Sequence, residues 1–249
     1  MNLDRAVVPS IVLAVGVAVG GLLAGNGFAR GRAAERYVTV KGVAEREVRA
    51  NLAIWPIHLV GADNDLAAAN AKLTKSVAGV RAFLVRHGID TTQVQVTDFS
   101  AIDAYANQYN NAERRVANRY VVHQTVLVRS NRPDQILAAS QQISELAAIG
   151  VVISSGNGEY GGGGGGGGPT FLFTDLNKLK PEMIADATAR AREAATQFAR
   201  DSRSELGAIR QANQGVFEIL PRDQAPGVSE SSQIAKVVRV VSTIDYFLR

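Results

Sequence analysis

Apolar residues recur with a helical period along one stretch in the first half of the chain. From Asp63 to Gly88 they follow one another at steps of three and four residues, which places them on one face of a helix. These residues are Leu66, Ala69, Leu73, Val77, Val80 and Leu84. Asp63 or Asp65 can cap the start of this helix, and Gly88 is a typical C-terminal stop. The pattern predicts an amphipathic helix that packs against a sheet.

Two further helices are predicted in the second half of the chain. One runs from about Arg132 to Ala148, opened by Pro133 and closed by Gly150. The other runs from about Leu179 to Ser204 and stops near Gly207. Its predicted core face consists of Ile184, Ala187, Ala191, Ala194 and Phe198, followed by Leu206. Because alanine is small, we expect this helix to dock closely on its neighbour.

Alternating apolar and polar residues predict β-strands between the helices. The strands are predicted at residues 37–40, 52–60, from 93, from 119, 151–160, 170–175, from 208 and from 236. Pro56 falls inside the second strand, where its missing N–H favours a sheet edge or a bulge. The element order predicts an α+β fold, with largely antiparallel sheets packed against long helices. Residues 37–130 and 131–249 would form two ββαββ-like halves, which suggests an internal duplication.

Two segments are predicted to be hairpin tips. One contains eight consecutive glycines, Gly161 to Gly168. A phosphate-binding loop is not favoured there, because the tract leads into Pro169 instead of a lysine and a hydroxyl at a helix start. The other tip spans Tyr105 to Arg115 and is either an ordinary loop or a subunit contact, for which exposed tyrosines are well suited. Its candidate contact residues are Tyr105, Tyr109, Arg114 and Arg115.

The amino-terminal segment is strongly apolar. No charge occurs from Ala6 to Ala29, and Arg5 and Arg30 flank the segment. About twenty apolar residues span a bilayer core, so we expect a membrane anchor and short linker at residues 1–36, followed by the folded domain at residues 37–249. A cleaved signal peptide is the alternative, but no clear cleavage site follows. Two GxxxG spacings predict close helix packing within the bilayer. They are formed by Gly16, Gly20, Gly21 and Gly25.

Composition and charge narrow the functional classes. The 249 residues carry a formal net charge of +4 without a cluster of arginines, so we expect no nucleic-acid partner. The absence of cysteine excludes disulfides and thiol catalysis. The histidines are His58, His87 and His123, and they lack the spacing of a metal site. We therefore expect no metal, no cofactor and no enzymatic function.

The last predicted helix resembles the hallmark of the SIMPL-domain family, an alanine-rich helix that ends in leucine-glycine. The matching residues are Ala187, Ala191, Arg192, Ala195, Ala199, Leu206 and Gly207. Shorter matches are Val40-Lys41-Gly42, Leu84 with Gly88-Ile89, and Thr97-Asp98-Phe99. The resemblance covers roughly Tyr37 to Leu248. The chain departs from the family pattern in two places. It has Arg49-Ala50-Asn51 where relatives carry a proline-aspartate turn, and it contains the glycine tract.

The resemblance implies an envelope protein, in a family whose members often carry an amino-terminal signal or anchor. Some relatives form large homo-oligomeric rings or cages, and some are linked to protection against oxidative and other envelope stress. We therefore expect a single-pass protein of the inner membrane, with its SIMPL domain in the periplasm. Its expected partners are the lipid bilayer and other copies of itself. The positive-inside rule opposes this topology, since Arg30, Arg32 and Arg36 follow the anchor.

Two other functional classes remain open. A binding module for lipid, cell-wall polymer or a small molecule would use the basic surface. An envelope enzyme would need a pocket with perturbed carboxylates or histidines. A structural, stress-protective assembly is the preferred hypothesis, because the sequence has no evident catalytic constellation.

Overall fold

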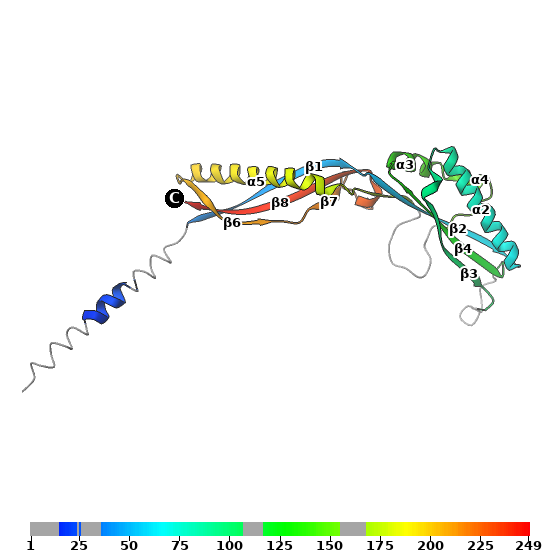
Figure 1. The fold of residues 1–249 in the computed structure, drawn as a ribbon, viewed down its shortest axis with the longest axis horizontal. Helices are drawn as coiled ribbons and strands as arrows, with labels where there is room; N and C mark the ends of the chain where they lie inside the picture. Colours follow the sequence, from blue (N-terminus) through cyan, green and yellow to red (C-terminus); the bar gives the residue numbers. More distant parts are fainter. Residues whose placement is uncertain (1–14, 24, 26–35, 107–116, 155–167) are drawn as a thin grey trace, which may run out of the picture. The chain divides into compact units, whose positions relative to one another are not determined.

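The protein has a mixed α+β fold. The computed structural model describes residues 15–23, 25, 36–106, 117–154 and 168–249 (Figure 1). The described part of residues 36–249 contains two four-stranded sheets and the helices α2 to α5. The pairings β2–β4, β2–β5, β3–β4, β6–β8 and β7–β8 are all antiparallel. The predicted α+β class with antiparallel sheets is thus confirmed.

Each sheet combines strands that are distant in sequence (Figure 1). The β1 sheet has the order β1-β8-β6, and β7 also pairs with β8. Its strands are β1 (Tyr37–Arg49), β6 (Leu206–Gln214), β7 (Glu218–Pro221) and β8 (Ala235–Leu248). The β2 sheet has the order β3-β4-β2-β5. Its strands are β2 (Leu52–Asp63), β3 (Val94–Asp103), β4 (Tyr120–Ser130) and β5 (Thr170–Leu172). The helices are α2 (Leu66–Arg86), α3 (Pro133–Gln141), α4 (Ser144–Ala148) and α5 (Leu176–Asp201), with short 3-10 turns η1 (Thr91–Gln93) and η3 (Glu230–Ser232).

The chain groups into two compact units, each built from separate segments. One comprises Met1–Val43, Ala185–Gly215 and Val241–Arg249, and the other Ala44–Ile184 and Val216–Val240. Both units take residues from either side of position 130. An origin of the chain from two consecutive ββαββ-like halves stays a hypothesis.

The larger hydrophobic core forms where α2 packs on β2 and β4. The side chain of Asp65 caps α2 by accepting a hydrogen bond from Ala68 N at 2.8 Å, and Gly88 after the helix has a φ of 71°. The predicted helix between Asp63 and Gly88 is therefore confirmed. The largest buried side chains of this core include Trp55 of β2 and Phe83 of α2. Their rings meet edge to face, with centroids 6.5 Å apart.

Pro56 lies in β2, which has β4 on one side and β5 on the other. On the β5 side, Ile54 pairs with Thr170, and Val60 N donates to Val152 O at 3.2 Å. Backbone groups alternate along a strand, so the missing N–H of Pro56 falls on this same side, between those two pairings. No described residue pairs with β2 at that point. The predicted edge position is thus correct only for this short stretch of an otherwise interior strand.

One predicted helix and two predicted strands differ in extent from the structure. The helix predicted from Arg132 to Ala148 is wrong as a single element: α3 and α4 are separate, because the amides of Gln142 and Ile143 bond to carbonyls three residues back and turn the chain. The strand predicted from residue 208 is observed as two strands, β6 and β7. The break between them begins at Gly215, whose N–H donates to Val241 O at 2.8 Å. Residues 151–154 form only an isolated bridge, and the rest of the strand predicted there lies outside the described residues.

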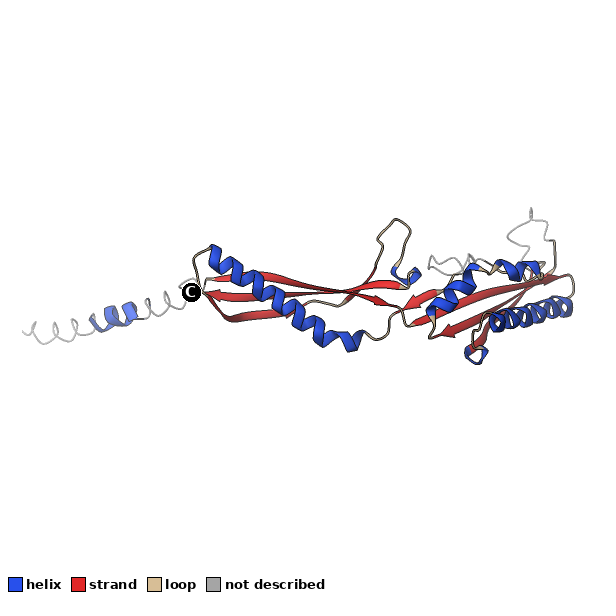
Figure 2. Cartoon of the chain, turned by 90° about the horizontal axis from the view of Figure 1, so that it is seen from above, coloured by secondary structure: helices blue, strands red, loops and turns tan. Residues whose placement is uncertain are grey.

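The core face of α5 also requires correction. Its buried side chains follow a four-residue step: Met183, Ala187, Ala191, Ala195 and Ala199. Ala194 is exposed and Phe198 is 49% exposed, so the face predicted through these two residues is wrong. Ala191 and Ala195 pack against Val38, Ile244 and Tyr246 of the β1 sheet, along which α5 runs (Figure 2). The buried alanines are those of the SIMPL-like motif, which shows that the motif describes a packing surface.

The predicted membrane anchor is described only in part. Residues 15–23 and 25 are helical, and the remainder of the apolar segment from Ala6 to Ala29 lies outside the described residues. Within the described ranges, no helix combines the length and apolar character needed to cross a membrane. The anchor stays a prediction.

Candidate functional site

Of the four subunit-contact residues predicted from the sequence, the structure describes one, Tyr105, at the base of the β3–β4 hairpin. Tyr109, Arg114 and Arg115 lie outside the described residues, whereas Tyr105 follows β3 and is 48% exposed. Its backbone N–H donates to Asp103 Oδ1 at 3.0 Å, as in an Asx turn. The turn holds an exposed tyrosine at a defined position.

Arg119 joins the two strands at this base. Its Nη2 and Nε donate to Asp103 Oδ2 at 3.0 and 3.2 Å. Its backbone carbonyl accepts from Ala104 N at 2.8 Å, and its backbone N–H donates to Asn64 Oδ1 at 3.0 Å. A bidentate arginine–carboxylate pair gives geometric definition as well as energy. The hairpin base is therefore held by side-chain and backbone bonds together.

The Arg119 guanidinium also lies over tyrosine rings. Its Cζ is 4.9 Å from the ring centroid of Tyr120 and 5.9 Å from that of Tyr105. Such contacts contribute about 0.5–1 kcal/mol at exposed sites. They restrict the rotamers of Arg119 and Tyr105, so less conformational entropy would be lost if a partner bound here.

The ion pair shifts the pKa values of both its members. The hydrogen bond from Arg119 is the main reason why the pKa of Asp103 lies below the ordinary value of 3.8. Burial opposes this lowering, and the backbone N–H of Tyr105 adds to it. The same hydrogen bond raises the pKa of Arg119. Asp103 therefore remains charged under mildly acidic conditions.

We expect Asp103→Asn to flatten the dependence of stability on pH. A carboxyl whose pKa is lowered in the folded state stabilises the fold above its ordinary pKa, and this contribution is lost as the pH falls through the lower folded value. Between about pH 5 and pH 2 the wild-type melting temperature should therefore fall more steeply than that of the variant. Arg119→Met, which removes the partner instead of the carboxyl, should flatten the curve similarly. Thermal melts at several pH values check this, and parallel curves for all three proteins would contradict it.

A bulge in β3 exposes an aromatic side chain. The register with β4 shifts between Thr97 and Ser100, and Asp98 adopts a φ of 55°. Aspartate accepts this left-handed conformation better than most residues, and Thr97 Oγ1 donates to its Oδ2 at 3.0 Å. Bulges commonly re-aim neighbouring side chains. Phe99, next in the chain, is 58% exposed.

The second half of β3 is exposed throughout. Residues 98–102 are all exposed, and Ile102 is 41% exposed. β4 is the one described strand that pairs with β3, so the far edge of β3 has no partner in the described part of the chain. An open strand edge that carries apolar side chains is a typical site for adding another chain. We call Phe99, Ile102, Tyr105 and Arg119 the hairpin surface.

Phe99, Ile102 and Arg119 were not among the contact residues predicted from the sequence. A signal for Phe99 was available in the match Thr97-Asp98-Phe99, since an aspartate within a strand pattern suggests a bulge. Arg119 gave no such signal, because its role depends on the position of Asp103 across the hairpin.

The other sequence candidates are dispersed. An added Cβ at Gly16, Gly20, Gly21 or Gly25 would meet no described atom within 4 Å, so packing inside the described chain does not require their small size. His58 Nδ1 lies 3.0 Å from Thr125 Oγ1, whereas the ring of His87 contacts that of Phe83 at a tilt of 53°, with centroids 4.3 Å apart. Among the residues that the structure describes, no group of three or more His, Cys, Asp or Glu could hold a metal ion.

Comparison with known proteins gives one strong match. The SIMPL family, described as a protein of unknown function (DUF541), matches residues 38–242. No curated protein matches the chain significantly.

Two crystal structures from Listeria innocua show weak similarity. One is of a hydrolase, with 7% identity and a TM-score of 0.21, and the other is of an uncharacterized conserved protein, with 8% identity and a TM-score of 0.20. Each comparison covers 79% of this chain and 90% of the other chain. These scores are too low to support any statement about fold or activity. The family match spans most of the chain and includes the buried alanines of α5, and on this basis the chain belongs to the SIMPL family.

Proposed function

We propose that this SIMPL protein is a structural subunit, without catalytic activity, that assembles with other copies of itself at the envelope membrane. The hairpin surface is its principal subunit contact, and the apolar amino-terminal segment anchors the assembly. The observation that carries the proposal is the exposure of Phe99 on a strand edge with no described partner, on the same hairpin as Arg119, which Asp103 holds in place.

Physical arguments favour this surface as an interface. Aromatic residues and arginine are enriched in the buried centres of interfaces, and a few such residues carry most of the binding energy. The hairpin surface supplies both residue types within a rigid frame. A contact between two different surfaces of each subunit closes into a ring when the rotation permits, which agrees with the assembly inferred from the family.

We expect Phe99→Asp to dissociate the assembly. A central aromatic contact contributes about 2 kcal/mol or more per interface, which weakens association roughly thirtyfold when it is lost. Light scattering on full-length protein in mild detergent should give a wild-type particle far above the 26.4 kDa of one chain, and a variant close to that mass.

Phe198→Asp is the matched control, because Phe198 is also half exposed, at 49% against 58% for Phe99, but lies on α5. It should leave the large particle intact. A monomeric wild type, or equal dissociation by both variants, would refute the hairpin surface as the contact. Anchoring is tested separately, by asking whether the full chain remains in the membrane fraction after carbonate extraction.

A further inference from the structure

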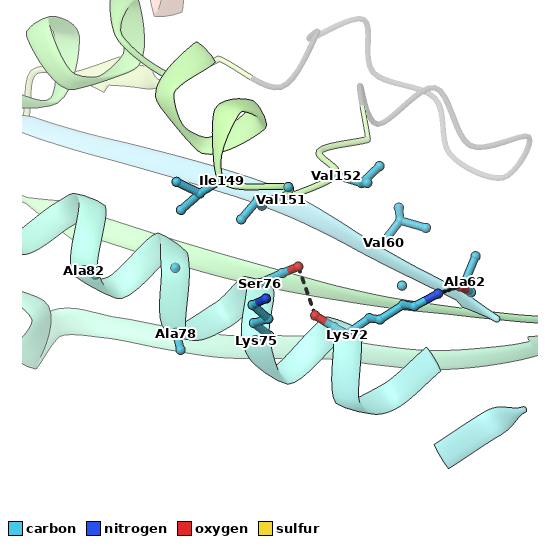
Figure 3. Close-up of a pocket in the computed structure, with 13 residues that line it drawn as sticks. Val60, Ala62, Lys72, Lys75, Ser76, Ala78, Ala82, Ile149, Val151 and Val152 are labelled. Carbon is cyan, nitrogen blue, oxygen red and sulfur yellow. Dashed lines mark hydrogen bonds between the residues drawn. The ribbon is translucent and has the colours of Figure 1, made fainter. Parts of the chain in front are cut away.

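A hollow of about 720 Å³ lies beside α2, in the same compact unit as the hairpin surface (Figure 3). One wall is formed by α2 between Lys72 and Ala82, and the other by residues 149–152, which follow α4. Val60, Gly61 and Ala62 at the end of β2 complete the lining. Its volume lies within the roughly 300–1,000 Å³ of typical small-molecule sites.

The walls are almost entirely apolar. The large lining side chains are Val60, Ile149, Val151 and Val152, of which Ile149 is 50% and Val152 59% exposed. The α2 wall carries small residues, and an added Cβ at Gly79 would lie 3.2 Å from both Ile149 Cδ1 and Val151 Cγ2. Gly79 thus lies close to the facing wall, and a larger residue there would be crowded by these two side chains.

Lysines are the charged groups among the described lining residues, and no carboxylate lines the hollow. Lys72 Nζ is already engaged, at 2.7 Å from Asp63 Oδ2 and 3.1 Å from Ala62 O. Ser76 is engaged as well, since its hydroxyl donates to Lys72 O at 3.1 Å, the bond drawn in Figure 3. Lys75 makes no ion pair or hydrogen bond with any described residue. The hollow therefore offers a mostly apolar surface and one available cation.

This combination restricts what can bind. A sugar or nucleotide would leave most of its polar groups without partners on these walls. A strand of another protein chain could not add to β2 here, because Val60 N and His58 O already bond to residues 152 and 154, at 3.2 and 2.9 Å. From Lys72 to Ala82 the hollow follows α2 over roughly 15 Å, at about 1.5 Å per residue. An elongated apolar ligand with one negative charge fits this length and this chemistry.

We propose that the hollow binds a long-chain fatty-acid carboxylate, with its acyl chain along α2 and its carboxylate at Lys75. This goes beyond the proposed assembly, because it assigns the chain a ligand that the hairpin surface does not require. Acyl chains are abundant where the predicted anchor would place the protein.

The test uses full-length protein in nanodiscs of phosphatidylcholine and a photoreactive diazirine myristate. Labelling should be saturable and should map to peptides from α2 and residues 149–152. Unlabelled myristate should compete at about tenfold lower concentration than its neutral methyl ester, since the ester cannot pair with Lys75.

Three variants make the test specific. Lys75→Glu should weaken labelling about tenfold, because attraction becomes repulsion. Arg81→Glu makes the same charge change at an exposed position of α2 that does not line the hollow, and it should have no effect. Ala82→Trp should abolish labelling by filling the hollow, and Phe99→Asp should leave it unchanged.

Several outcomes would overturn the proposal. These are labelling that does not saturate, equal competition by the methyl ester, or equal effects of Lys75→Glu and Arg81→Glu. Cross-links that a bifunctional reagent forms between the α2 peptides of two chains, without myristate labelling of the hollow, would show that a second copy occupies it instead. If Ala82→Trp lowers the melting temperature, the comparison of the two charge variants still decides the question.

Discussion

Replacing Gly42 by alanine is expected to lower the free energy of unfolding by about 3 kcal/mol or more. Gly42 is buried in β1, directly beneath α5. A Cβ placed there would lie 1.8 Å from Ala187 O and 2.6 Å from Ala191 N, both far inside van der Waals contact. The obstructing atoms belong to the helix backbone, so no rotamer change can relieve the clash. The helix would have to move away from the sheet and lose the packing of its alanine stripe.

Lys41→Ala is the matched control for this prediction. Lys41 is the exposed neighbour of Gly42 in the same strand, and its replacement should change stability by no more than about 0.5 kcal/mol. Denaturant unfolding of the two variants measures the difference. Adding Ala191→Gly to Gly42→Ala should bring no recovery, because it removes a side chain and leaves the obstructing backbone in place. Equal midpoints for Gly42→Ala and Lys41→Ala would disprove the close approach of α5 to β1.

Removing the carboxylate of Glu230 is the second change with a large expected effect. Lys236 in β8 has 0% exposure, and its ammonium pairs with the Glu230 carboxylate and with the Glu230 carbonyl. Breaking a buried pair from one side leaves a desolvated charge, at a cost of about 3–5 kcal/mol. The Glu230 side chain is 30% exposed, so we expect Glu230→Gln to lower the free energy of unfolding by about 3 kcal/mol, at the lower end of this range.

Lys236→Met should cost much less than Glu230→Gln. Methionine fills a similar volume without a charge, and the remaining Glu230 carboxylate can reach water. The double variant should resemble Lys236→Met, because the lone buried charge is then absent. A double-mutant cycle in denaturant measures this coupling. Equal losses for the two single variants would show that the charge of Lys236 is not what makes the pair costly to break.

The proposed function and the proposed ligand site make different demands on the chain. Assembly depends on a surface that is rigid before binding, which the bonds of Arg119 to Asp103 and Asn64 supply. The hollow depends on small residues along α2 that leave space. Variants at Phe99 and at Lys75 therefore probe independent properties of the chain.

Local signals in the sequence identified several elements correctly. The Asp65 cap, the apolar spacing and Gly88 define α2 within a segment of neighbouring residues, so its limits could be predicted without knowledge of the rest of the fold. The alternation from Lys236 onward marked β8 in the same way. For α5, apolar spacing suggested a face through Ala194 and Phe198, whereas the family motif contained the alanines that are buried. The spacing correctly placed Ala187 and Ala191 on the buried face and failed at Ala194 and Phe198, because the sheet that the helix meets, with its close approach at Gly42, decides which positions are covered.

Strand partners and the hairpin surface required the tertiary structure. β1 and β2 are separated by two residues, yet they belong to different sheets, because each pairs with strands distant in sequence. Phe99 is exposed at the bulge of β3, where the register with β4 shifts, and Arg119 acts through a carboxylate across the hairpin. By itself, the sequence determined the α+β class, the limits of α2 and β8, and the family, since these follow from local periodicity, caps and motif residues. The tertiary structure alone decided which strands pair, which face of α5 is buried and which residues form the hairpin surface and the hollow, because these depend on contacts between distant segments.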